Sequence, residues 1–266
     1  TNEESYWTAA LEEEPEHAKL AAELSKDATA VHIGTYIENL KEINMKNSYF
    51  RIVGKVWFRW NGDKDLDMAN NFRVYNGTMN NKEIIKENSS GKSHYQLVSF
   101  DVTVFKNYWT TRFPLESHQL RFYIEPEYDI DRVVFIADTE ECDVNPSFST
   151  AGYELVRFAN GVHTNEYQTS YGDPTIEDHA IISEFLTQLE LNRNGFGIYL
   201  KCFIALLGTT LWVFITMFLC TYHRVDPLGM LPAALFGTVS NIAIGASLVP
   251  DALDTGLLEY VNAWGV

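Results

Sequence analysis

Acidic side chains recur at alternate positions in one short segment, and such carboxylates are suited to binding calcium. The segment EPEYDID carries them at Glu125, Glu127, Asp129 and Asp131. Calcium prefers about six to eight oxygen ligands, which carboxylates on loops can supply. The alternative is a solvated acidic face that only concentrates cations. We therefore expect either a regulatory Ca2+ site or an acidic surface here, and we expect no other cofactor.

A second group of residues indicates a path for ions rather than a reaction. On a helix of 3.6 residues per turn these residues form a single stripe. The stripe consists of Gly229, Ala233, Phe236, Ser240, Ala243 and Ser247. Small and polar side chains suit close-packed neighbours or water better than lipid. The stripe predicts either helix packing or a water-filled pore lined by several copies, with Phe236 as a dewetting gate.

The charge of the chain favours cations as partners. Its formal net charge of -16 argues against nucleic acid and against anionic substrates. Asp226, just before the stripe, would form a ring of carboxylates in a repeated assembly, and such rings favour cations. The same residue, followed by Pro227, is also a strong helix N-cap. The seven histidines show no spacing typical of nucleophilic or metal chemistry, so we do not expect an enzyme.

Three stretches of different pattern must position these residues. Residues 1–30 are acidic and rich in Glu, Ala and Leu, which predicts a helical linker or the remnant of an upstream domain. Residues 31–193 alternate apolar and polar side chains between turn signals, which predicts an antiparallel β-sandwich that binds a ligand. Residues 194–266 are largely apolar, which predicts membrane-spanning helices.

We expect the apolar region to cross the membrane more than once. A first span is predicted at 195–222, a pore-lining second span at 227–250, and the start of a third at 255–266, with the rest of that domain outside this sequence. The expected fold is thus an all-β extracellular or periplasmic sandwich followed by an all-α transmembrane helical domain, with an N-terminal helical linker.

One motif resembles the signature loop of a known family. The segment RFPLESHQLRFYIEP is similar to the Phe-Pro-x-Asp-x-Gln loop of the pentameric ligand-gated ion channels, the Cys-loop receptor superfamily. Phe113 and Pro114 match, whereas Glu116 stands where Asp is usual and His118 where Gln is usual. The flanking cysteines of animal receptors are absent, as in bacterial members. The segments VWFRW and SLVPDALDTGLLEY add to the resemblance.

The resemblance implies a homopentamer whose second helices line a cation-selective pore in the lipid bilayer. It implies a coupling interface where the sandwich meets the membrane, including a pair between Glu116 and Arg193. The expected coupling residues are Lys46, Phe113, Pro114, Glu116, Arg193, Pro250 and Asp251.

The resemblance also implies a site for a small-molecule agonist between neighbouring sandwiches. Aromatic side chains from several loops suit cationic amines there. The matching positions are Tyr75, Tyr128, Tyr167 and Tyr171. The implied location is the bacterial inner membrane, with the sandwich on its periplasmic or extracellular side. The competing interpretation is a membrane-anchored β-sandwich binding module without conductance.

Overall fold

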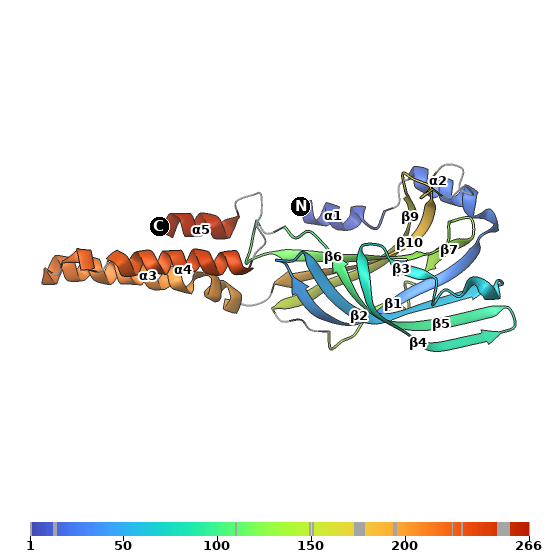
Figure 1. Ribbon diagram of the computed structural model, residues 1–266, viewed down its shortest axis with the longest axis horizontal. Helices are drawn as coiled ribbons and strands as arrows, with labels where there is room; N and C mark the ends of the chain where they lie inside the picture. Colours follow the sequence, from blue (N-terminus) through green and yellow to red (C-terminus); the bar gives the residue numbers. More distant parts are fainter. Residues whose placement is uncertain are drawn as a thin grey trace.

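The two ends of the molecule differ in kind, with β-strands at one end and helices at the other (Figure 1). This computed structural model describes residues 2–12, 15–109, 111–148, 150, 152–172, 179–193, 196–224, 226–229, 231–248 and 256–265.

The larger of two sheets has six strands in the order β4-β5-β2-β1-β7, with β8 also paired to β1. Its strands are β1 (Thr29–Asn44), β2 (Tyr49–Asn61), β4 (Gly77–Ser90), β5 (Ser93–Phe105), β7 (Val133–Ala137) and β8 (Asp143–Val144). Burial alternates along β2 and β5, as the sequence pattern predicts. Both β7 and β8 run parallel to β1, so the prediction of a wholly antiparallel sandwich was wrong. Alternation marks a strand but not the direction of its distant partner.

The second sheet has four antiparallel strands in the order β3-β6-β10-β9. These are β3 (Phe72–Val74), β6 (Ser117–Pro126), β9 (Tyr153–Glu166) and β10 (Ile181–Arg193). The core lies between the two sheets, where Phe100 and Phe122 pack with ring centroids 5.9 Å apart. The hydroxyl groups of Thr35 and Thr187 lie 3.1 Å apart across the same space. One shared core therefore holds both sheets as a sandwich.

Two short helices precede the sandwich, and the first one packs on it. They are α1 (Asn2–Ala9) and α2 (Pro15–Leu24), followed by the 3-10 turn η1 (Ser25–Asp27). Trp7 of α1 is buried, and the guanidinium of Arg157 on β9 stacks 4.1 Å from its ring. A second 3-10 turn, η2 (Lys64–Leu66), follows β2. Because α1 buries an aromatic side chain against the second sheet, it is part of the folded body.

The prediction of an all-α transmembrane domain at the helical end was wrong. This end consists of α3 (Phe196–His223), the 3-10 turn η3 (Pro227–Gly229), α4 (Leu231–Leu248) and α5 (Leu257–Gly265). Among the described residues, only α3 is long and apolar enough to cross a membrane. The turn η3 removes the first residues of the expected second span, so α4 has 18 residues and reaches about 27 Å, short of a hydrocarbon core of about 30 Å. The nine residues of α5 are far too few.

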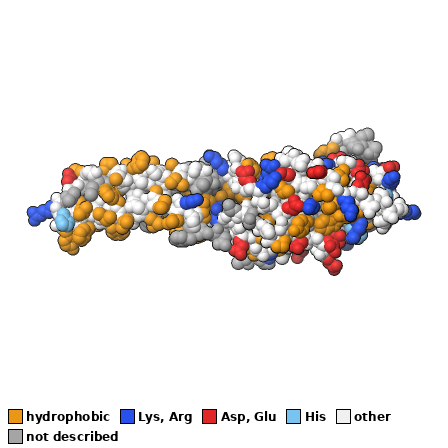
Figure 2. Space-filling model, turned by 90° about the horizontal axis from the view of Figure 1, so that it is seen from below, with side chains coloured by type: hydrophobic (Ala, Val, Ile, Leu, Met, Phe, Trp, Pro, Cys, Tyr) orange, Lys and Arg blue, Asp and Glu red, His pale blue; other side chains and the backbone are white. Residues whose placement is uncertain are grey.

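The helices α3 and α4 lie side by side (Figure 1). A Cβ atom added to Gly237 would lie 2.0 Å from the Oγ1 atom of Thr209, so glycine allows this close approach. Hydrophobic side chains cover much of the helical end, whereas the charged ones gather over the sandwich (Figure 2). On α3 the exposed apolar side chains include Leu211, Phe214 and Met217. An apolar surface of this kind suits a membrane rather than water.

Candidate functional site

A buried ionic cluster lies where the sandwich meets the helices. Glu116 precedes β6 and Arg193 is the last residue of β10. The Nε atom of Arg193 donates to Oε1 of Glu116 at 2.5 Å, and both side chains are largely buried. The hydroxyl of Tyr153 on β9 donates to the same carboxylate oxygen at 3.3 Å and accepts a hydrogen bond from Arg193. The predicted pair between Glu116 and Arg193 is thus confirmed as a contact.

Neighbouring groups and burial together set the protonation states in this cluster. Burial raises the pKa of Glu116, but the neighbouring His118 and the positive charge of Arg193 outweigh it, so its pKa lies below the ordinary value. Burial lowers the pKa of His118, whose Nε2 atom lies 3.5 Å from the Glu116 carboxylate. Burial also raises the pKa of Tyr153. At neutral pH the cluster therefore contains an ionised Glu116 and Arg193 beside a neutral histidine and a neutral phenol.

The loop that precedes Glu116 carries the sandwich into contact with the helices. Phe113, buried, packs in one apolar cluster with Cys202 and Phe203 of α3 and Leu258 of α5. The guanidinium of Arg193 lies 5.3 Å from the Phe113 ring centroid. The backbone N–H of residue 257 donates to the carbonyl of Thr111 at 2.9 Å. These contacts surround the ionic cluster and join the sandwich to α3 and α5.

The remaining predicted coupling residues are placed as follows. Pro114 is buried beside Phe113 in the same loop. Lys46 is exposed in the turn between β1 and β2, while its neighbour Met45 brings its sulfur to 4.0 Å from both Arg193 and Tyr153. Met45, rather than the predicted lysine, therefore contacts the cluster. Pro250 and Asp251 lie outside the described residues.

At the other end of the second sheet, three of the four predicted ligand-site tyrosines lie together. The rings of Tyr75 and Tyr167 are 5.9 Å apart, and those of Tyr167 and Tyr171 are 5.4 Å apart, both edge to face. Tyr123 extends the group, with its ring 6.5 Å from that of Tyr75. Tyr128 lines the same cavity of about 370 Å³ as Tyr171, but its ring is covered by the guanidinium of Arg132. The tyrosines form an aromatic surface in which Tyr123 was not predicted.

A buried carboxylate lies behind this aromatic surface. Glu125 is fully buried, and its two oxygens accept from Arg73 at 3.0 Å, Tyr167 at 2.5 Å and Asn165 at 3.2 Å. Burial, followed by the charge of Glu125, raises the pKa of the nearby Glu184 to about 8. The site therefore combines exposed aromatic faces, which attract cations, with a buried carboxylate that is paired with Arg73.

The four carboxylates predicted to bind calcium do not form one site here. Glu125 belongs to β6 and forms an ion pair with Arg73. The other three, Glu127, Asp129 and Asp131, follow the end of β6 at Pro126. The alternation that would place them on one face ends with the strand. In the part of the chain that the structure describes, no three His, Cys, Asp or Glu side chains gather as a metal site. Calcium remains a prediction without a located site.

The predicted pore stripe lies on the face of α4 that points away from α3. Phe236 is 75% exposed, Gly229, Ala233, Ala243 and Ser247 are also exposed, and Ser240 is half-buried with its hydroxyl donating to the carbonyl of Phe236 at 2.8 Å. Asp226 is exposed and accepts from the N–H of Leu228 at 3.0 Å, so it caps the turn η3, as the sequence indicates. The opposite face of α4 holds the buried Thr238 and Asn241, while Gly237, at the side of the helix, packs on Thr209 of α3.

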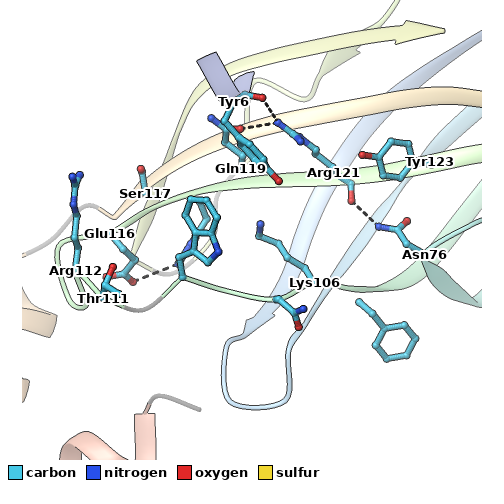
Figure 3. Close-up of a pocket in the computed structure, with 14 residues that line it drawn as sticks. Tyr6, Asn76, Lys106, Thr111, Arg112, Glu116, Ser117, Gln119, Arg121 and Tyr123 are labelled. Carbon is cyan, nitrogen blue, oxygen red and sulfur yellow. Dashed lines mark hydrogen bonds and ion pairs between the residues drawn. The ribbon is translucent and has the colours of Figure 1, made fainter. Parts of the chain in front are cut away.

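Sequence reasoning missed a third feature, a cavity of about 500 Å³ between α1, β6 and the loop after β5 (Figure 3). Its lining includes Tyr6, Lys106, Trp109 and Arg121. These residues are far apart in the sequence, and no motif in the sequence brings them together.

The chain matches no family model, and no curated protein matches it.

Proposed function

We propose that the chain is a subunit of a homopentameric ligand-gated ion channel, selective for cations, in the bacterial inner membrane. The proposal rests on the resemblance of its signature loop and on one structural observation, the buried cluster of Glu116, Arg193 and Tyr153. This cluster joins that loop to the strand that leads into α3. Charges that are mostly shielded from water interact more strongly than surface charges, so the cluster can bias a conformational equilibrium.

In this proposal the agonist binds at the aromatic surface of Tyr75, Tyr167 and Tyr171, on the periplasmic or extracellular side. The favoured agonist class is a small cationic amine, because the faces of aromatic rings attract a cation. A ligand that displaces Tyr167 changes its hydrogen bond to Glu125, and both residues lie in the sheet that ends at Arg193. This sheet is the proposed route to the coupling cluster.

In this proposal conduction is assigned to the exposed face of η3 and α4 together, because α4 alone is shorter than the hydrocarbon core. Copies of α4 arranged about a common axis would turn the stripe inward, with α3 behind them exposing Leu211 and Phe214 to lipid. The side chains of Phe236 would then meet as an apolar ring, and such rings close a pore by dewetting. Asp226 would provide the carboxylates at one mouth, which favours cations.

Reconstitution of the full-length protein in planar bilayers tests the proposal. We expect cation-selective current and a fivefold assembly in detergent. The variant Phe236→Ala should open more easily or leak, because removing the ring wets the constriction. Phe214→Ala on α3, which exposes a ring of the same kind, is the matched control and should conduct like the wild type. A monomer, or a protein that never conducts under any ligand, pH or calcium condition, contradicts the proposal.

A second candidate is the membrane-anchored binding module without conductance. It is favoured by the finding that α3 is the only helix among the described residues that could cross a membrane. The two candidates share the aromatic surface but differ in current. A protein that binds amines at Tyr167, yet neither conducts nor assembles, supports the binding module.

A further inference from the structure

The cavity beneath α1 has aromatic walls, and two basic residues, Lys106 and Arg121, lie among them (Figure 3). Tyr6 contributes from α1, Phe105 and Trp109 from β5 and the loop after it, and Tyr123 from β6. The ring of Tyr6 lies 5.9 Å from that of Trp109. A space of about 500 Å³ with such walls is large enough for a small aromatic molecule.

Two cations share this cavity, and neither has a carboxylate partner within ion-pair distance among the described residues. Arg121 is held by the backbone carbonyl of Tyr6 at 2.6 Å and by Gln119 at 3.0 Å, both neutral groups. Its Nε atom is buried and has no hydrogen-bond partner within the described chain. Burial, and next the charge of Arg121, lowers the pKa of Lys106 to about 8. Lys106 lies over the Tyr108 ring, 5.6 Å from its centroid.

The carboxylate that also lines the cavity does not balance these cations. Glu116 already accepts hydrogen bonds from Arg193, with which it is ion-paired, and from Tyr153. The histidine beside it, His118, has a lowered pKa because it is buried, and it is neutral at pH 7. The cavity is therefore locally positive in a chain whose net charge is -16. Holding like charges together in a partly dry space is unfavourable, and a bound anion would relieve this cost.

We propose that this cavity binds a small aromatic carboxylate. The carboxylate lies between the ammonium of Lys106 and the Nε side of Arg121, where a charge-assisted hydrogen bond satisfies the orphaned donor. The ring lies against the exposed face of Trp109, because Tyr6 and Trp109, with ring centroids 5.9 Å apart, already touch each other. Tyr123 lies between this cavity and the tyrosines at the far end of the sheet, so the two sites adjoin. The binding proposed here does not depend on conduction. Because Tyr6 forms one wall, the ligand also ties α1 to the sandwich.

Calorimetric titration of the full-length protein in detergent with sodium benzoate tests this assignment. We expect saturable binding of benzoate and at least about tenfold weaker binding of neutral benzyl alcohol, because only the anion meets the two cations. Lys106→Met and Arg121→Gln should each weaken benzoate binding by about tenfold or more. Lys92→Met, in the exposed turn between β4 and β5, removes the same charge at the opposite end of the sandwich and should bind like the wild type.

Conservative variants separate lost charge from lost structure. Lys106→Arg keeps the cation and should retain most of the benzoate affinity, whereas Lys106→Met should lose it although its thermal melting is unchanged. Quenching of tryptophan fluorescence gives a second readout, since Trp109 is exposed at the cavity wall. Equal affinities for benzoate and benzyl alcohol, or wild-type affinity in Lys106→Met, would overturn the proposal.

Discussion

The variant Glu116→Gln removes one charge from the cluster between sandwich and helices and leaves its shape intact. The distance of 2.5 Å between Glu116 and Arg193 corresponds to a Coulomb attraction of about 7 kcal/mol at an effective dielectric constant of about 20, before the cost of burial. The side chain of Arg193 is only 9% exposed, so water cannot replace the lost carboxylate. Breaking a buried pair costs about 3–5 kcal/mol, and we expect about 3 because glutamine still accepts a hydrogen bond.

Thermal unfolding of the full-length protein in detergent measures this loss. At about 2–4 °C for each kcal/mol, Glu116→Gln should melt roughly 10 °C lower than the wild type. Glu38→Gln is the matched control, since Glu38 pairs with Lys55 at 2.9 Å where both side chains are about one-third exposed. Exposed pairs contribute about 0–1 kcal/mol, so this control should melt close to the wild type.

Two further measurements test the cause of the effect. Adding Arg193→Met to Glu116→Gln should recover part of the stability, because no charge then stays buried without a partner. The pKa of Glu116 is lowered in the folded state, so its stabilisation is present above the ordinary glutamate pKa of about 4.3 and is lost as the pH falls through the lower folded value. Equal melting of Glu116→Gln and Glu38→Gln at neutral pH would refute the reasoning.

Three other outcomes can be checked on the same protein. Gly237→Ala should lower the free energy of unfolding by about 1–3 kcal/mol, and so melt at a lower temperature, because its Cβ meets Thr209. Gly208→Ala, with no atom within 4 Å of its added Cβ, should not be destabilised. Glu184 has a pKa raised to about 8 by burial and a neighbouring carboxylate, so folded protein keeps a proton that unfolded chain loses above about pH 4.3, and stability falls through that window. Near pH 4, Glu184→Gln should therefore melt at the same temperature as the wild type. Near pH 8 it should melt at a higher temperature, because it is then more stable by about 1 kcal/mol or more. Benzoate affinity should fall as the pH rises past the pKa of Lys106, about 8. In Lys106→Met the affinity should depend little on pH. Any pH dependence that is left in this variant would come from the other titratable groups of the lining, Arg112, Glu116, Tyr6 or Tyr123.

Local alternation was sufficient to predict strands such as β2 and β5, because one face of each is buried, whereas β4 is exposed along most of its length. Along β2, buried positions alternate with more exposed ones at every second residue. The same reasoning failed for the carboxylates after Glu125, since the strand ends at Pro126 and the alternation ends with it. It also gave no warning that β7 and β8 run parallel to β1, because pairing direction depends on residues far away in the chain.

The helical end was over-predicted for a different reason. An uncharged stretch from 227 to 250 is long enough to cross a membrane, but length alone does not place the first helical turn. Asp226 caps the short turn η3 instead, and α4 begins only at Leu231. The contact between Glu116 and Arg193 could be predicted from the family resemblance, whereas the cavity at Lys106 could not. Its wall comes from Tyr6, in a segment whose sequence shows no pattern that predicts docking.

The parallel pairing of β1 with β7 constrains the order in which the chain can fold during synthesis. Thr29 pairs with Val133, so the ribosome makes the whole stretch between them before β1 receives its second neighbour. The hairpins that β1 forms with β2, and β4 with β5, can close earlier because their partners are adjacent in the chain. Until residue 137 emerges, one edge of β1 is bare, and a nascent chain in this state is most exposed to wrong pairing with its neighbours.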